Sequence, residues 1–254
     1  MSLFRLMTAT EITQWLLTEG RLCTSSPELL KKFGTLLQDK IGCSRIWLGT
    51  VVLHPQAAGY VWFYEDGAIR ERIFSYKEYA VLENIDSPAI RLSRGVQEIR
   101  LAAPDADGMP DVEALFESGY AAFFALPVFF QGKYAGGVTY SSHQPFTPDD
   151  IALLRSIQPV LSAVIEPLTC RLITSTLLET YLGADAGRRV FLGQVKRGDG
   201  QTLRSVIWFS DIRGFTSMSE KLELSRLLET LNIAFEQVVN AVVQHGGQVL
   251  KFIG

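Results

Sequence analysis

The feature of this sequence that most constrains its fold is a pair of apolar, strand-like runs joined by a two-residue polar turn. The stretch "AAFFALPVFFQGKYAGGVTYSS", residues 121–142, turns at Gln131 and Gly132. A glycine in such a pair permits the left-handed backbone that two-residue hairpin turns require. A second pair, Asp66 and Gly67, joins two similar runs in "GYVWFYEDGAIRERIFS". The sequence therefore predicts two β-hairpins and an antiparallel sheet.

Helical patterns flank these strand-like segments on both sides. Residues 10–20 read as a helix ending at Gly20, and residues 26–41 as a helix with Ser26 as N-cap. The second helix has Pro27 at its first position, where proline is tolerated, and Gly42 is predicted to end it. A third helix follows the sheet in "TPDDIALLRSIQPVLSAVIEPL", capped by Thr147. Its apolar stripe recurs at helical spacing and comprises Ile151, Leu154, Ile157, Leu161 and Ile165.

Two further runs, "SRIWLGTVVL" and "VQEIRLAA", are rich in the branched and aromatic residues that favour strands. Helices, antiparallel strands and a closing helix together predict an α+β domain over residues 1–168.

Composition and charge narrow the classes of function. The chain has 254 residues, a length that allows one or two domains, and a net charge of −3, which argues against binding to nucleic acid or a membrane surface. The longest apolar run, residues 121–130, is half the roughly 20 residues of a membrane helix, and Pro127 interrupts it. The three cysteines have no zinc or disulfide spacing, so we expect inert thiols in a cytoplasmic protein.

Residues 169–203 are predicted to connect two domains. "LTCRLITSTLLETYL", residues 168–182, has one apolar face formed by Leu168, Leu172, Ile173, Leu177, Leu178 and Tyr181. This face is either a homodimer contact or the inner face of a last helix packed on its own domain. Residues 183–204 are rich in glycine and basic residues, and indicate a domain boundary. The cluster of Arg188, Arg189, Lys196 and Arg197 is either a phosphate contact or a solvated linker.

The first domain resembles a GAF domain. The stretch "FFALPVFFQGKYAGGVTYSSHQPFTPDDIALLRSIQPVLSAVIE" has the Leu-Pro strand, the glycine turn, the second strand and the Phe-Thr-x-x-Asp helix entry that are typical of GAF domains. The resemblance implies a sensory or dimerisation domain over residues 1–168. Such a domain either binds a small molecule and drives dimerisation or serves as an unliganded dimer scaffold. The cyclic-nucleotide signature and the bilin-attachment cysteine of some GAF domains are not evident.

The last 51 residues read as strand, helix, strand. "RSVIWFSD", residues 204–211, is predicted to be a buried strand, and Ser217 with Glu220 fits a capping box that begins a short helix. Residues 223–245 show one apolar stripe at helical spacing and stop at Gly246. "QVLKFI" is the next strand.

Asp211 stands at the end of that strand, just before a helix start. A carboxylate there can hold a hard cation such as Mg²⁺, and the following backbone amides can bind phosphate. Without further context, a lone aspartate before a turn is more often a helix cap.

"VIWFSDIRGFTSMSE" and "LNIAFEQVVNAVVQHGGQVLKFIG" resemble the start of the class III nucleotidyl cyclase catalytic domain, which has a ferredoxin-like fold. The resemblance covers residues 204–254 and implies a role for six residues. Asp211 matches a metal-binding aspartate, and Ile212 matches a position whose carbonyl meets a metal. The triphosphate-binding turn and the adenine-selecting position are matched by Gly214, Phe215, Thr216 and Lys251.

The resemblance implies an adenylate cyclase, a phosphorus–oxygen lyase that converts ATP to 3′,5′-cyclic AMP and pyrophosphate. Two Mg²⁺ or Mn²⁺ ions would act in a homodimer. The family pattern continues with an aspartate after Gly254, and other family residues for base selection, ribose and the transition state lie farther on. We therefore expect a truncated cyclase whose catalytic residues are incomplete here and which is inactive by itself. The alternative is a non-enzymatic GAF signalling or dimerisation module with a decayed cyclase start.

Overall fold

The structure is a computed structural model that describes residues 8–54, 57–196, 202 and 204–249. The chain forms two compact units, Met1–Ile173 and Thr174–Gly254, and each is described by itself.

The first unit is built on a six-stranded antiparallel sheet. Its strands are β1 (Cys43–Val51), β2 (Ala57–Glu65), β3 (Ala68–Ser75), β4 (Ile99–Ala102), β5 (Ala122–Phe130) and β6 (Lys133–Ser142). They pair in the order β3-β2-β1-β6-β5-β4. Both predicted hairpins are confirmed, since β2 pairs with β3 and β5 with β6. Their turns adopt the left-handed backbone expected, with φ of 45° at Asp66 and 49° at Gln131.

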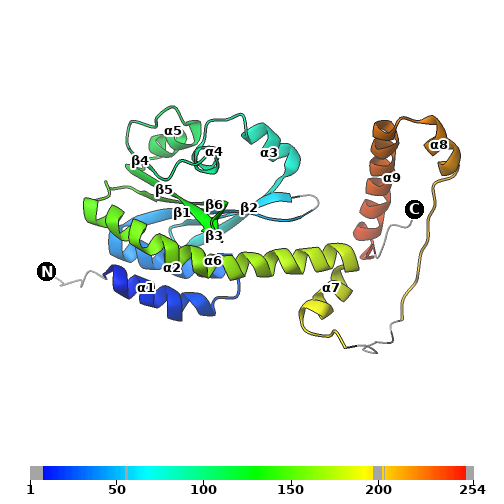
Figure 1. Cartoon of the computed structure of the whole chain (residues 1–254), viewed down its shortest axis with the longest axis horizontal. Coiled ribbons are helices and arrows are strands. Elements are labelled where there is room, and N and C mark those ends of the chain that lie inside the picture. Colours follow the sequence, from blue (N-terminus) through cyan, green and yellow to red (C-terminus); the bar gives the residue numbers. More distant parts are fainter. Residues whose placement is uncertain (1–7, 55–56, 197–201, 203, 250–254) are drawn as a thin grey trace. The chain divides into compact units, whose positions relative to one another are not determined.

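Helices cover both faces of this sheet (Figure 1). One face packs against α1 (Ala9–Thr18), α2 (Ser26–Ile41) and the first part of α6 (Pro148–Leu182). The short 3₁₀ turn η1 (Gly20–Leu22) joins α1 to α2. The opposite face carries α3 (Tyr76–Leu82), α4 (Pro88–Ser93) and α5 (Pro110–Glu117). The α+β fold predicted from the sequence is therefore confirmed for this unit.

The helix ends follow from local sequence, with one correction. Ser25, and not Ser26, is the N-cap of α2, because its side chain accepts a hydrogen bond from the amide of Glu28. Ser26 and Pro27 are the first two helical residues, so the proline still falls where its missing N–H costs nothing. Gly42 ends the helix with φ of 67°, as predicted. Thr147 caps α6 by accepting from the amide of Asp150 at 3.2 Å.

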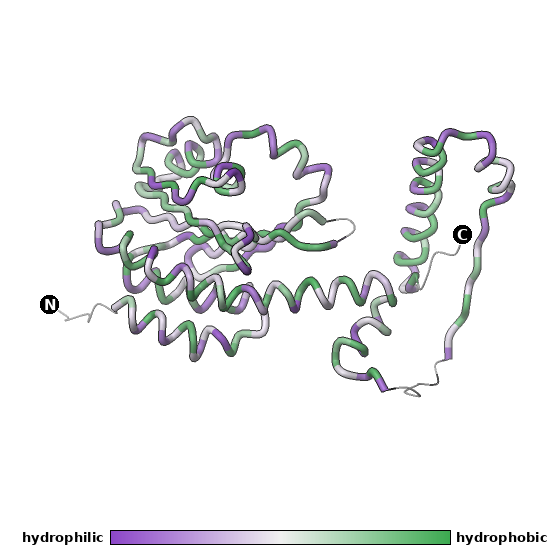
Figure 2. The backbone as a smooth tube through the Cα atoms, viewed as in Figure 1, coloured by the Kyte–Doolittle hydropathy of each residue, from purple (hydrophilic) through white to green (hydrophobic). Residues whose placement is uncertain are grey.

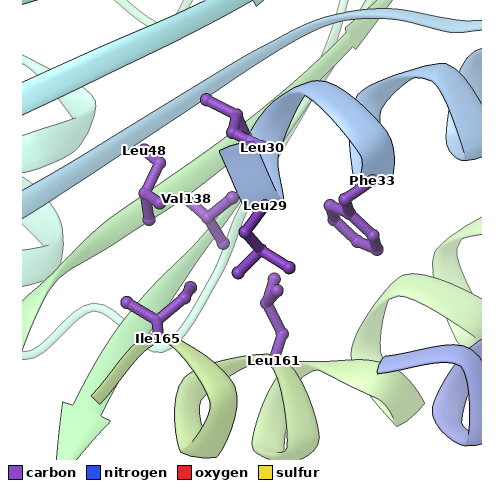
Figure 3. Close-up of a pocket in the computed structure, with 7 residues that line it drawn as sticks. All are labelled: Leu29, Leu30, Phe33, Leu48, Val138, Leu161 and Ile165. Carbon is purple, nitrogen blue, oxygen red and sulfur yellow. The ribbon is translucent and has the colours of Figure 1, made fainter. Parts of the chain in front are cut away.

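The core between α2, α6 and the sheet is closely packed. Figure 3 shows seven apolar side chains around a void of about 10 Å³: Leu29, Leu30, Phe33, Leu48, Val138, Leu161 and Ile165. All seven side chains are apolar, so the void offers no hydrogen-bond partner to a water molecule, and it is far smaller than the roughly 300–1,000 Å³ of small-molecule sites. It is therefore a packing defect of the core and not a ligand site.

Helix α6 is long and apolar enough to span a membrane by length and composition. The apolar stripe in its first part is buried on the sheet, from Ile151 at 1% exposure to Ile165 at 0%. A core helix of this kind passes the same composition test. The helix continues past the sheet, and Pro159 and Pro167 lie inside it.

The second unit contains the end of α6 with α7 (Ala184–Phe191), α8 (Phe215–Lys221) and α9 (Leu224–Gln244). Helix α7 folds back on α6 at Gly187, where an added Cβ would lie 2.5 Å from the backbone nitrogen of Glu179. Apolar and polar residues alternate along α9 in the pattern of an amphipathic helix (Figure 2). This helix confirms the one predicted for residues 223–245.

Two predictions for this unit are wrong. Residues 204–211 form no strand, and the side chains expected to be buried are exposed, at 96% for Val206 and 79% for Phe209. A strand needs a neighbour to satisfy its N–H and C=O groups, and every described strand belongs to the other unit. The capping box of Ser217 and Glu220 is also absent, because α8 already begins at Phe215 after the left-handed Gly214. The predicted strand over 248–253 lies largely outside the described residues.

Candidate ligand cavity

A cavity of about 680 Å³ lies between the sheet and helices α3, α4 and α5. Its volume is within the roughly 300–1,000 Å³ usual for sites that hold small organic molecules. The sheet supplies the floor and the three short helices the roof.

The floor follows from the two-residue period of the strands. Ile46, Leu48 and Val138 face the helical core, so the intervening residues of β1 and β6 face the cavity. The strand register places the cavity-facing residues in three rows across β2, β1 and β6. These rows are Glu65–Arg45–Ser141, Phe63–Trp47–Thr139 and Val61–Gly49–Gly137.

The indole of Trp47, in the middle row, extends over the neighbouring row that contains Gly49 and Gly137. A Cβ at Gly49 would lie 2.5 Å from Trp47 Cη2, and one at Gly137 would lie 3.5 Å from Trp47 Cζ3. The indole therefore lies over two residues that have no side chain. Phe63 pairs with Trp47 across the strands, so this part of the floor is aromatic.

Arg91 and Tyr134 make hydrogen bonds to the segments that form the roof. Arg91 of α4 donates to both carboxylate oxygens of Asp86, at 2.8 and 2.6 Å, and to the backbone oxygen of Asp107 at 2.8 Å. It also pairs with the carboxylate of Asp107. Hydrogen bonding to Arg91 lowers the pKa of Asp86. From the floor, the Tyr134 hydroxyl donates to the carbonyl of Ala89 at 3.3 Å, and burial raises the pKa of Tyr134.

The row of Arg45, Glu65 and Ser141 forms the polar end of the cavity. Glu65 accepts a hydrogen bond from the Tyr120 hydroxyl at 3.2 Å and pairs with Arg70. The Tyr120 ring stacks on His143 with centroids 4.2 Å apart. Burial, and then the charge of Glu65, raise the pKa of Tyr120. Arg45 Nε lies 3.9 Å from Glu65 Oε1, which is an ion pair but too long for a hydrogen bond.

The predicted metal and phosphate residues lie together in one exposed turn of the second unit. Asp211 Oδ1 accepts the amide of Ile212 at 2.9 Å, and the Phe215 amide donates to the Ile212 carbonyl at 3.2 Å. Gly214 has φ of 76°, and Thr216 lies in the first turn of α8. Lys251 lies outside the described residues. Within the described ranges, no group of three or more His, Cys, Asp or Glu side chains could hold a metal.

The structure thus brings five of the six predicted site residues into one turn and leaves their proposed roles untested. It adds a cavity that the sequence did not reveal, because the three roof helices were missed. Signals for two of them exist: Ser75 and Glu78 form a capping box at α3, and Ser87 precedes Pro88 at the start of α4. Their short length, 7 and 6 residues, hides the helical period.

Comparison with solved structures finds GAF domains. The GAF domain of a phosphoenolpyruvate-protein phosphotransferase from Coxiella burnetii is 14% identical with a TM-score of 0.45, over 66% of this chain and 98% of that chain. The GAF domain of a sensor histidine kinase from Bacillus halodurans is 17% identical with a TM-score of 0.43, over 57% and 97%. The phycocyanobilin-bound GAF domain of a cyanobacterial phytochrome is 11% identical with a TM-score of 0.40, over 64% and 96%.

No protein-family profile and no curated protein matches the chain. These three solved structures have TM-scores of 0.40 to 0.45 and identities of 11% to 17%, over 57% to 66% of this chain. Nothing in these comparisons shows a cyclase domain.

Proposed function

We propose that the first unit is a GAF-type regulatory domain that binds a small organic molecule in the cavity between the sheet and α3–α5. The observation that carries this proposal is the cavity of about 680 Å³. Its floor has an aromatic part at Trp47 and Phe63 and a polar end at the row of Glu65, Arg45 and Ser141. A mostly apolar cavity with a few polar groups at one end is the usual form of a small-molecule site. The alternative role, an unliganded scaffold, would require a sealed core at this place.

Native mass spectrometry of the purified chain tests the proposal. We expect a bound small molecule, or saturable one-to-one binding of an added aromatic probe. Ala89 lines the roof and is half-buried, so Ala89→Trp should fill the cavity and abolish binding without disturbing the fold. Unchanged binding in this variant would place the ligand elsewhere and contradict the proposal.

We further propose that the chain is a homodimer in which the second half of α6 forms the contact. The candidate face is smaller than the sequence indicated, because Leu168 is buried in its own domain and Leu172 packs against the same core. Of the residues left in this face, Tyr181 is 72% exposed, and Leu182, which follows it in the chain, is 43% exposed. Light scattering should give a dimer mass that Leu177→Asp with Tyr181→Asp reduces to a monomer. A wild-type monomer mass would contradict the proposal.

A second candidate function is that residues 204–254 begin an adenylate cyclase domain acting on ATP with two Mg²⁺ or Mn²⁺ ions. The sequence from Asp211 to Thr216 favours it, because these residues fall on a turn that leads through a left-handed glycine into α8. The 21-residue helix α9 follows, as the family pattern implies.

A cyclic AMP assay with ATP and Mn²⁺ tests this second proposal. A two-metal site uses more than one carboxylate, and Asp211 is the one that the motif supplies, so we expect no turnover by the 254-residue chain. A longer protein that continues the motif is expected to form cyclic AMP and to lose this activity in Asp211→Ala. Retained activity in that variant would overturn the assignment of Asp211 as a metal ligand.

A further inference from the structure

At the polar end of the cavity two guanidinium groups, those of Arg45 and Arg70, share one carboxylate, that of Glu65. Glu65 pairs more closely with Arg70 than with Arg45, and it also accepts a hydrogen bond from the Tyr120 hydroxyl. Arg45 reaches Glu65 only at 3.9 Å, and its Cζ lies 5.9 Å from the centre of the Tyr120 ring. A guanidinium has five N–H donors in a planar fork that matches an oxyanion.

Two hydroxyl residues extend this end of the site. Ser141 pairs with Arg45 across the strands, and Thr139 lies one row further along β6. Both line the cavity and both are buried, at 2% and 8% exposure. A hydroxyl can donate a hydrogen bond to an anion. Arg45, Ser141 and Thr139 thus form a set of donors on the floor.

Aromatic and apolar side chains occupy the adjoining part of the cavity. Trp47 and Phe63 lie in the row next to Arg45, and the Trp47 indole lies over Gly49 and Gly137 of the following row. Leu82, Ile90 and Leu115 line the roof. Rows two residues apart along a strand are separated by about 6.6 Å, so a ligand spanning from Arg45 to Gly49 would be about 13 Å long. Flat aromatic walls favour a planar ring system.

We propose that the ligand of this cavity is a planar aromatic molecule bearing an oxyanion, a carboxylate or a phosphate, bound by Arg45. This inference rests on the proposed function of the cavity and adds the chemical class of its ligand. The aromatic body lies over Trp47, and the oxyanion accepts from Arg45 with Ser141 and Thr139 beside it.

The test uses two fluorescent probes that share one aromatic frame. 1-Anilinonaphthalene-8-sulfonate carries an anion, and N-phenyl-1-naphthylamine is its neutral counterpart. A charge-assisted pair inside a cavity should make the anionic probe bind at least about tenfold more tightly. Arg45→Gln should remove this preference and leave the affinity for the neutral probe within about twofold. Arg45→Lys, which keeps the charge without the planar fork, should give an intermediate affinity.

Arg72 provides the matched control. It also lines the cavity, but its side chain is 59% exposed and its guanidinium lies 3.7 Å from Glu78, whereas Arg45 is 30% exposed. Arg72→Gln should therefore leave the binding of both probes unchanged. An equal loss in the Arg72 and Arg45 variants would overturn the assignment to the Arg45 end. Urea unfolding of each variant verifies that the fold is retained.

The outcomes separate this inference from the function on which it rests. If both probes bind equally and Arg45→Gln changes neither, the anion inference is wrong and the cavity remains a ligand site. If neither probe saturates, or Ala89→Trp leaves binding unchanged, the proposed function itself fails. Competition with 2-naphthoate and 2-naphthyl phosphate then distinguishes the two oxyanions. Failure of both to displace the anionic probe would overturn the inference.

Discussion

Gly49 illustrates how a single residue shapes the cavity. Because Gly49 has no side chain, the Trp47 indole can lie directly against its backbone. An added Cβ at Gly49 would lie 2.5 Å from Trp47 Cη2. Gly49→Ala must push the indole toward the cavity, and overpacking of this kind costs about 1–3 kcal/mol of unfolding free energy. Urea unfolding should measure this loss, together with a shift of tryptophan fluorescence.

The control for this prediction is the double variant Trp47→Ala with Gly49→Ala. Once the indole is gone, the added methyl group no longer meets it, so the two changes should not be additive. Additive losses would contradict the contact between Gly49 and Trp47.

A pH effect is expected at the start of α2. Hydrogen bonds from Lys32, and from the amide and hydroxyl of Thr24, lower the pKa of Glu28 to about 2 from 4.5. A lowered pKa means that the ionised form stabilises the fold, so this contribution is present above pH 4.5 and is lost as the pH falls toward 2. The difference in urea midpoint between wild type and Glu28→Gln should therefore shrink between pH 6 and pH 2.5.

Glu117→Gln serves as the comparison, because Glu117 is an exposed glutamate at the end of α5. A difference for Glu28→Gln that is constant with pH would contradict the role of its charge.

The roles of single residues could be predicted where they depend only on neighbours in the sequence. Gly42, Thr147 and the two hairpin turns were predicted correctly, because a cap or a turn depends on a few neighbours in sequence. Arg45 and Trp47 line one cavity because of the strand register and because helices cover this face of the sheet. Neither the register nor the position of these helices can be predicted from the sequence next to Arg45 and Trp47. Asp211 was singled out by its position at the end of an expected strand and by family resemblance, and its role stays a prediction.

At the scale of elements, α6 combines a core helix with an exposed extension. Leu161 in its first part is 2% exposed and borders the core void, whereas Leu182 at its end is 43% exposed. Leu161→Ala is expected to cost about 2–5 kcal/mol of unfolding free energy, as for buried leucines generally. Leu182→Ala should change it by less than about 0.5 kcal/mol in the monomer. Chemical unfolding at low protein concentration compares the two, and similar losses would contradict this division of the helix.

The packing of α2 on the sheet depends on Gly34. An added Cβ would lie 2.4 Å from Tyr64 Cγ, because the helix approaches the face of this fully buried ring. Alanine usually stabilises a helix interior by about 1 kcal/mol relative to glycine. Here Gly34→Ala should instead destabilise the protein by about 1–3 kcal/mol, since α2 must move off the sheet. A gain in stability would show that the helix accommodates the methyl group.

Helices were predictable where they are long enough to show the 3.6-residue spacing of their apolar residues. Helices α2 and α9 have 16 and 21 residues and were predicted nearly to their ends. The strand expected at residues 204–211 failed for a different reason. Its residues have strand propensity, but a strand forms only where a neighbour accepts its hydrogen bonds, and propensity says nothing about that neighbour.

At the scale of the whole molecule, the two buried apolar clusters consist of residues between Ile12 and Leu168. All of these residues belong to the first unit. We therefore expect a chain ending after Leu182 to fold by itself and to unfold in one cooperative transition, with the midpoint of the first unit in the full chain. Urea unfolding followed by circular dichroism measures both midpoints.

The cavity lies in the same unit, so the shortened chain should also bind the anionic probe with unchanged affinity. A lower midpoint or a weaker affinity would mean that residues 183–254 contribute to the stability or the cavity of the first unit.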